Sequence, residues 1–139
     1  MPRACESFKK ISKKSDEEWL YQTDKAWDAI HRCLTDGKLE FNNGECPYSM
    51  CILGGQLLYS ASDYIIALKE PSQVENVSVA LAKLDETWFR ERYFSMANDY
   101  GHPKSEDDFK YTWDWFKGLG EFFGKAAAAK RHIIFTVDQ

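Results

Sequence analysis

The sequence predicts an α+β domain in which a small sheet, built from a central hairpin and a C-terminal strand, is covered by four helices. Apolar residues recur with helical periodicity in four segments, and two regions are rich in β-branched and aromatic residues without that periodicity. The predicted order of elements is β-α-β-β-α-α-α-β. A chain of 139 residues has the size of one domain, so residues 1–139 are expected to fold around a single core.

The N-terminal half is expected to contain a weakly patterned strand at Ser7–Ile11, then a helix and the hairpin. The helix is placed at Asp24–Thr35, because apolar residues gather on one side of it and Asp24 suits the N-cap. The hairpin joins the apolar runs 49–60 and 63–70. The pair Gly54-Gly55 interrupts the first run, which predicts a bulge or a tight bend; no helix and no Lys-Ser or Lys-Thr pair follows, which excludes a phosphate-binding loop.

The next elements are marked by their caps and by composition. Pro71 is expected to end the second hairpin strand, and Ser72 with Glu75 forms a predicted capping box for the following helix. Asp85 is the predicted cap of a short aromatic helix, DETWFRERYF. The run HIIFTV at 132–137 is typical of a strand and completes the predicted sheet.

The stretch from 107 to 131, DDFKYTWDWFKGLGEFFGKAAAAKR, is predicted to be one helix capped by Ser105. Its charged residues alternate in sign along one narrow strip, which is typical of a solvent-facing edge. A second arc, beside that strip, contains Tyr111 and Trp115. The core stripe is expected to pack against the sheet and comprises Phe109, Trp113, Phe116, Phe123 and Ala127.

Charge and composition exclude several classes of function. The net charge of −4 disfavours binding to nucleic acid or to an anionic membrane. No apolar segment approaches the roughly 18 residues of a membrane span, and the N-terminus lacks the apolar stretch of a signal peptide, so a cytoplasmic location is expected. No cofactor motif occurs. The cysteines lack metal-binding spacing and are expected to be free thiols, with Cys33 buried and Cys46 and Cys51 nearer to an exposed loop.

Five runs, taken together, cover nearly the whole chain: DKAWDAIHRCLTDG, ILGGQLLY, DYIIALKEPSQVENV, WFRERYF and FFGKAAAAKRHIIFTVDQ. In this order they resemble the successive blocks of the YfbM-like family of bacterial proteins, which is catalogued as a domain of unknown function. The run Asp24–His31 and the closing block are the most specific of these features. The resemblance implies a compact bacterial α+β domain and supplies no activity, cofactor or catalytic residue.

The run Asp24–His31 also contains a candidate small-molecule site. His31 follows Trp27 by one helical turn, at the border between the apolar and charged faces. A histidine there suits a contact at the mouth of a pocket, and it equally suits a packed residue that donates to a carbonyl. Tyr64 at the hairpin turn and Arg92 on the short helix are further polar groups for such a cleft, with ordinary surface positions as the alternative.

No nucleophile–base pair or carboxylate dyad emerges from the sequence, so catalytic residues stay unknown and a non-enzymatic function is favoured. Aromatic residues make up 15% of the chain, and tyrosine and tryptophan are over-represented at interfaces. The sequence therefore favours an intracellular protein-binding factor of the inhibitor, immunity or accessory type. Its partner is expected to be a toxin, an enzyme or a second copy, bound at Tyr111 and Trp115. The alternative is a small-molecule binder or hydrolase with a cleft around Trp27 and His31.

Overall fold

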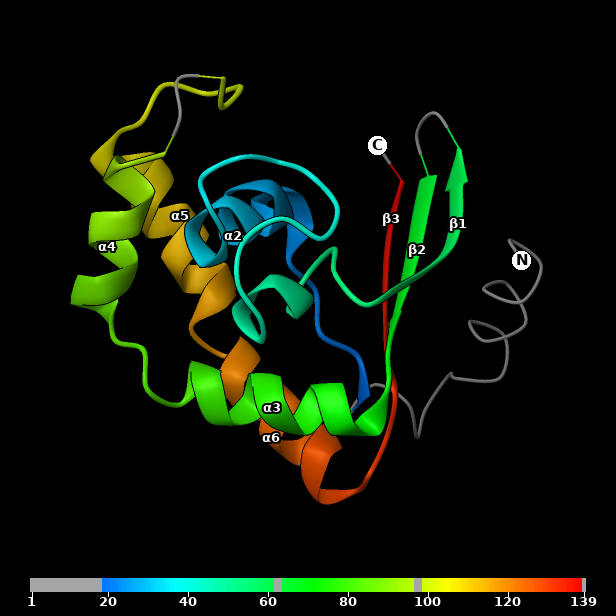
Figure 1. Cartoon of the computed structure of the whole chain (residues 1–139). Helices are drawn as coiled ribbons and strands as arrows, with labels where there is room; N and C mark the ends of the chain where they lie inside the picture. The colour runs from blue at the N-terminus through cyan, green and yellow to red at the C-terminus, as the bar shows by residue number, and fades with distance from the viewer. Residues whose placement is uncertain (1–18, 62–63, 97–98, 139) are drawn as a thin grey trace.

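The computed structural model of the chain describes residues 19–61, 64–96 and 99–138 (Figure 1). The strand predicted at Ser7–Ile11 lies outside these residues. The structure confirms the α+β class, with a three-stranded antiparallel sheet whose strands are β1 (Gln56–Ala61), β2 (Tyr64–Lys69) and β3 (Ile133–Asp138). The described strands lie in the order β1-β2-β3, and β3 pairs with β2 from Tyr64↔Asp138 to Lys69↔Ile133.

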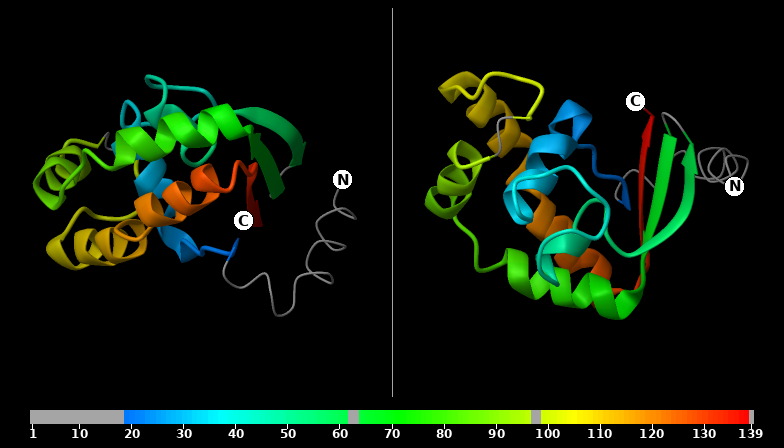
Figure 2. Two further views of the ribbon diagram at one scale, coloured as in Figure 1. Left: turned by 90° about the horizontal axis from the view of Figure 1, so that it is seen from below. Right: turned by 45° about the horizontal axis from the view of Figure 1, so that its top comes forward.

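The described helices lie on one side of the sheet (Figure 1). Helix α3 follows β2 and helix α6 precedes β3, and the two run side by side from the end of the sheet where β2 ends and β3 begins (Figure 2). All four segments predicted as helical contain helix. The α-helices are α2 (Trp27–Leu34), α3 (Pro71–Leu81), α4 (Glu86–Phe94), α5 (Glu106–Phe116) and α6 (Leu119–Ala128), with short 3-10 turns at η2 (Asp24–Ala26) and η3 (Tyr48–Met50).

The first hairpin strand begins later than predicted, because the run 49–60 becomes extended only at Gln56. The preceding residues, Cys51 to Leu53, form a turn that is at most 4% exposed. An apolar segment buried on all sides does not show by its pattern whether it is a strand. Gly54 and Gly55 form the predicted tight bend: a Cβ on Gly54 would lie 2.2 Å from the Ser49 carbonyl oxygen, and Gly55 has φ +97°.

The cap of α3 differs from the prediction, while two other caps are confirmed. The helix begins at Pro71, and the N–H of Glu70 donates to Gln73 Oε1 at 2.8 Å, so the capping pair is Glu70 and Gln73 in place of Ser72 and Glu75. Proline fits the first helical position because its fixed φ is helical and it needs no N–H partner there. Asp85 and Ser105 cap α4 and α5 as predicted, accepting from backbone N–H groups three residues on.

The C-terminal helix predicted as one piece is two helices, α5 and α6, which meet at Lys117 and Gly118. Tyr21 explains the break, because its hydroxyl donates to the carbonyl of Trp115. In an unbroken helix that carbonyl would accept from the N–H of Leu119. A Cβ at Gly118 would lie 3.0 Å from the Tyr21 hydroxyl oxygen, so glycine gives the tyrosine its room.

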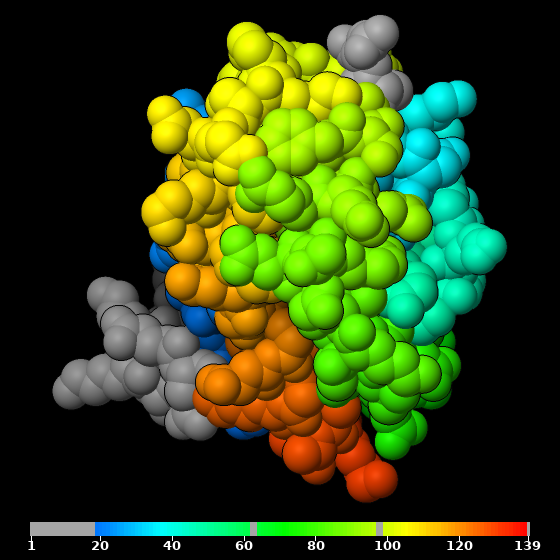
Figure 3. All heavy atoms as spheres, turned by 90° about the vertical axis from the view of Figure 1, so that its left-hand side faces the viewer, coloured from blue at the N-terminus to red at the C-terminus, as the bar shows by residue number. Residues whose placement is uncertain are grey.

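The core stripe of α5 packs against α4, which corrects the prediction that it packs against the sheet. Phe89 of α4 lies at the centre, with its ring centroid 4.4 Å from Phe116, 5.6 Å from Trp113 and 6.4 Å from Phe109. Figure 3 shows the atoms of α4 and α5 in continuous contact over this face. Trp27 of α2 contacts the sheet, with its ring centroid 5.9 Å from that of Phe135 of β3.

Candidate functional site

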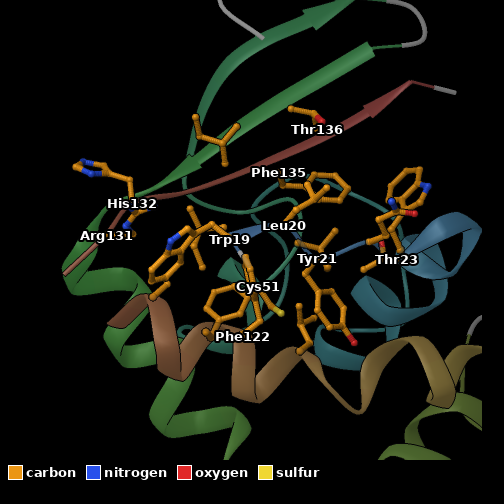
Figure 4. A pocket seen from close by; sticks show the side chains of 18 of the residues that line it. Trp19, Leu20, Tyr21, Thr23, Cys51, Phe122, Arg131, His132, Phe135 and Thr136 are labelled. Atoms are coloured by element: carbon orange, nitrogen blue, oxygen red, sulfur yellow. The ribbon is translucent and has the colours of Figure 1, made fainter. Parts of the chain in front are cut away.

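A cavity of about 700 Å³ lies between β3, α6 and the extended segment 19–24 (Figure 4). This volume falls within the range of about 300–1,000 Å³ that is typical of ligand pockets. Most of its wall is apolar, and six Phe, Trp and Tyr residues contribute to it: Trp19, Tyr21, Trp27, Phe122, Phe123 and Phe135.

The cavity runs along one edge of β3. Successive side chains of a strand point to opposite faces, so a cavity that touches one face is lined by every second residue. Here every residue from Lys130 to Val137 lines the cavity, which places it beside the strand. In the part of the chain that the structure describes, no backbone–backbone hydrogen bond from Ile133–Asp138 goes outside the pairing with β2. Backbone donors and acceptors of β3 are therefore available on the cavity side.

The opposite wall, segment 19–24, is fastened to α5 by hydrogen bonds. The Tyr21 hydroxyl donates to the Trp115 carbonyl, and the Tyr111 hydroxyl donates to Asp24 Oδ2. The Lys25 N–H donates to the Tyr111 hydroxyl oxygen at 3.2 Å. The bond from Tyr111 lowers the pKa of the Asp24 carboxyl, which stays ionised. Thus the two residues predicted to bind a partner, Tyr111 and Trp115, hold the wall of the cavity.

The two ends of the cavity differ in charge. Lys130, Arg131 and His132 precede β3 in an exposed row and line one end. The guanidinium carbon of Arg131 lies 4.0 Å from the ring centroid of Trp19, close enough for a cation–π interaction. Asp24 also lines the cavity and lies three residues before Trp27, whose ring contacts Phe135, whereas Trp19 contacts Arg131.

Lys69, the last residue of β2, lies behind the cavity wall and is fully buried. Its Nζ donates to the Ile52 carbonyl and lies 5.4 Å from the ring centroid of Phe135. Burial lowers the pKa of Lys69 to about 7 and raises that of the neighbouring Cys51 thiol to about 12. We did not predict this lysine from the sequence, although strand alternation carries a signal: Ile65, Ala67 and Lys69 fall on the same face.

The predicted small-molecule site is not assembled as one cluster. Trp27 lines the large cavity, and it also lines a second cavity of about 220 Å³. His31, Tyr64 and Arg92 line neither of these two cavities. Tyr64 lies at the hairpin end, where its ring centroid is 5.9 Å from that of Tyr59.

His31 and Arg92 instead make contacts that support the end of α2. His31 is 1% exposed, with Nε2 2.7 Å from both the Glu40 carbonyl oxygen and Asn43 Oδ1, and burial lowers its pKa. Arg92 donates from Nε to the Cys33 carbonyl at 3.1 Å and from its terminal nitrogen to the Thr35 carbonyl. These carbonyls have no partner within the helix, so the arginine satisfies them.

The cysteines offer one exposed thiol among those described. Cys33 is buried, as predicted, and burial raises its pKa. Cys51 is buried as well, which corrects its predicted place near an exposed loop, whereas Cys46 is exposed. No three His, Cys, Asp or Glu side chains gather into a possible metal site within residues 19–61, 64–96 and 99–138. None of the helices in these ranges is long and apolar enough to cross a membrane.

Fold and cavity together define a small α+β domain with an accessible sheet edge beside an aromatic cavity. The chain belongs to the family described as Domain of unknown function (DUF1877), whose model matches residues 3–136. This match agrees with the domain-of-unknown-function family that the resemblance implied. The description of the family names no activity. Among curated proteins and among solved structures, nothing matches the chain.

Proposed function

We propose that this chain is a non-enzymatic, YfbM-like protein-binding factor that takes an extended segment of a partner protein into the cavity beside β3. The observation that supports this most directly is the uninterrupted run Lys130–Val137 along the cavity, which brings the strand's backbone edge to it. An added strand bonds to such an edge through its main chain and is selected by the side chains it places in pockets. This is a general mode of peptide recognition and needs no catalytic group.

The shape of the cavity supports an extended occupant. Segment 19–24 and β3 form two long walls, and the aromatic rings between them offer apolar contact to every second side chain of an inserted strand (Figure 4). Tyr111 and Trp115 hold the outer wall, so the surface for the partner extends toward α5. The role is that of an inhibitor, immunity or accessory factor in the bacterial cytoplasm, with a toxin or an enzyme as the partner.

Selection from a random peptide library on the purified protein tests this function. We expect enrichment of sequences that alternate apolar and polar residues, and protection of the Ile133–Asp138 amides from hydrogen exchange when a selected peptide binds. Thr23→Trp places an indole in the cavity wall and should abolish binding, while Thr87→Trp, an exposed position on α4, should not. Failure to enrich any peptide, or binding that leaves the β3 amides unprotected, would refute the proposal. A homodimer that protects the same amides would identify a second copy as the occupant instead.

A second candidate is a small-molecule binder or hydrolase, favoured by the cavity volume and by Trp27 in its wall. A thermal-shift screen with nucleotides and common metabolites tests it. A ligand of this cavity should raise the melting temperature of the wild type and of Thr87→Trp, and should leave that of Thr23→Trp unchanged. His31→Ala should retain the response, because His31 does not line the cavity. If no compound gives this pattern, the candidate is rejected.

A further inference from the structure

The charged side chains around the cavity are distributed unevenly along β3. Lys130, Arg131 and His132 lie where the strand begins, and Asp138 is where it ends. Asp24 lies toward the end of the cavity that is nearer to Asp138. It precedes Trp27 by three residues, and Trp27 contacts Phe135, which is past the middle of the run 130–137. An occupant therefore meets positive charge beside the start of β3 and negative charge beside its end.

The positive end is built to receive an anion. In the described chain, no carboxylate lies within ion-pair distance of Lys130, Arg131 or His132. Arg131 lies against the Trp19 ring, which orients a guanidinium while its N–H groups remain able to donate in the ring plane. A guanidinium held in this way suits a carboxylate, which it can bind through two parallel hydrogen bonds.

We propose that the occupant is a strand antiparallel to β3 that carries a carboxylate at its C-terminal end, next to Lys130–His132. This inference rests on the proposed function and specifies the chemistry of the partner. In an antiparallel pair the C-terminal end of the added strand lies beside the start of β3, where the cations are. Antiparallel pairing is also slightly more stable per residue than parallel pairing, and it continues the pattern of β1, β2 and β3. A basic residue at the N-terminal end of the strand then faces Asp24 and Asp138.

The test uses synthetic peptides long enough to pair with the six residues of β3, labelled for fluorescence anisotropy. Their centre alternates valine and threonine. One peptide begins with lysine and ends with glutamate, a second has these two residues exchanged, and both are acetylated and amidated. A third repeats the first with the glutamate replaced by glutamine and a free C-terminal carboxylate. We expect the first and third to bind about tenfold tighter than the second at low salt, with the difference reduced at high salt.

Two variants locate the effect. The double substitution Arg131→Gln with His132→Gln should bring the first and second peptides to similar affinity, while Lys83→Gln, an exposed position after α3, should leave their ratio unchanged. Tighter binding of the exchanged peptide would overturn the antiparallel direction. Equal binding of both by the wild type would overturn charge recognition, and the proposed function would stand if Thr23→Trp abolished binding of both. Absence of binding by all three peptides, together with failure of the library selection, would overturn the proposed function itself.

Discussion

Two regions of this molecule are rich in aromatic residues and use them differently. In the Phe89 cluster, which we define as Phe89, Tyr93, Phe109, Trp113 and Phe116, rings pack on rings. At the cavity some rings also pack on rings, as Tyr21 does on Phe122 and Trp27 on Phe135. Cations contact more of the rings there: Trp19 lies 4.0 Å from Arg131 and 4.5 Å from Lys125, and Phe135 lies 5.4 Å from Lys69. Aromatic content therefore does not by itself distinguish a core from a site. What distinguishes them is burial: Phe89, Tyr93, Phe109 and Phe116 are at most 5% exposed, whereas Trp19, Tyr21, Phe122 and Phe135 are half-buried.

Removing the central ring of each region is the strongest way to test this comparison. Phe89→Ala should cost about 3–5 kcal/mol in the free energy of unfolding, because Phe89 is fully buried and its three ring neighbours cannot all close over the space. Phe135→Ala should cost less than half as much, since one side of that ring already faces the cavity. Urea unfolding of both variants measures the difference. Equal losses would show that the cavity side is packed as tightly as the Phe89 cluster.

The buried cation of the cavity side gives the second test, in the pH dependence of stability. The pKa of Lys69 is about 7 in the folded chain and near 10.4 when unfolded, so between these values the unfolded chain binds more protons and stability rises with pH. The slope should be on the order of 1 kcal/mol per pH unit between pH 7 and 10. Below pH 7 Lys69 is protonated in both states and should contribute no pH dependence. The groups that face it are Cys51, whose pKa of about 12 keeps it neutral, and His31, which burial keeps neutral.

Lys69→Met should remove this slope, while Lys83→Met, an exposed position, should preserve it. Urea unfolding at pH 7, 8 and 9 measures all three proteins. If the free energy of unfolding has the same pH dependence in the wild type and in Lys69→Met, the ammonium of Lys69 is solvated in solution. The cavity wall is then more open than in the structure.

The third test sets two tryptophans of one helix against each other. Trp113 contacts Phe89 and Phe116 in the Phe89 cluster, whereas the ring of Trp115 contacts Tyr111 at 6.4 Å, toward the wall of the cavity. Both are half-buried, so each alanine variant should lose less than a fully buried ring: about 2–3 kcal/mol for Trp113→Ala and about 1 kcal/mol for Trp115→Ala. Trp115→Ala should also weaken binding of a selected peptide. Equal, large destabilisation by the two would mean that the whole of α5 is core, and Trp115 would leave the proposed partner site.

The features that could be predicted from the sequence are local ones. Asp85 and Ser105 cap their helices through bonds to N–H groups three residues away, and the patterns of β2 and β3 lie within six residues each. The α+β class follows from these elements. Such contacts depend on neighbours in the chain, so the sequence pattern carries them.

The features that could not be predicted depend on residues distant in the chain. The break at Gly118 follows from the Tyr21 hydroxyl, which donates a hydrogen bond to the Trp115 carbonyl, 94 positions further along the chain. The burial of Lys69 depends on the Ile52 carbonyl and on Phe135 from another strand. Likewise the cavity forms because segment 19–24 lies opposite β3, although the two are far apart in the chain. Trp27 was predicted as a site residue from its neighbour His31, and it lines the cavity without that histidine.

The smallest expected effect, on two exposed aliphatic side chains, separates the cavity from ordinary surface. Leu20 in the cavity wall and Val79 on α3 are 58% and 55% exposed. Leu20→Ser and Val79→Ser should therefore each change the free energy of unfolding by at most about 0.5 kcal/mol. Their effects on a neutral, environment-sensitive dye should differ, because Leu20 adjoins aromatic walls that can enclose the dye, whereas Val79 is a single apolar side chain on a helix. Fluorescence titration should show weaker dye binding for Leu20→Ser alone. Equal dye binding by both variants and the wild type would place the dye elsewhere, and a loss above about 1 kcal/mol for Leu20→Ser would show that this wall is packed core in solution.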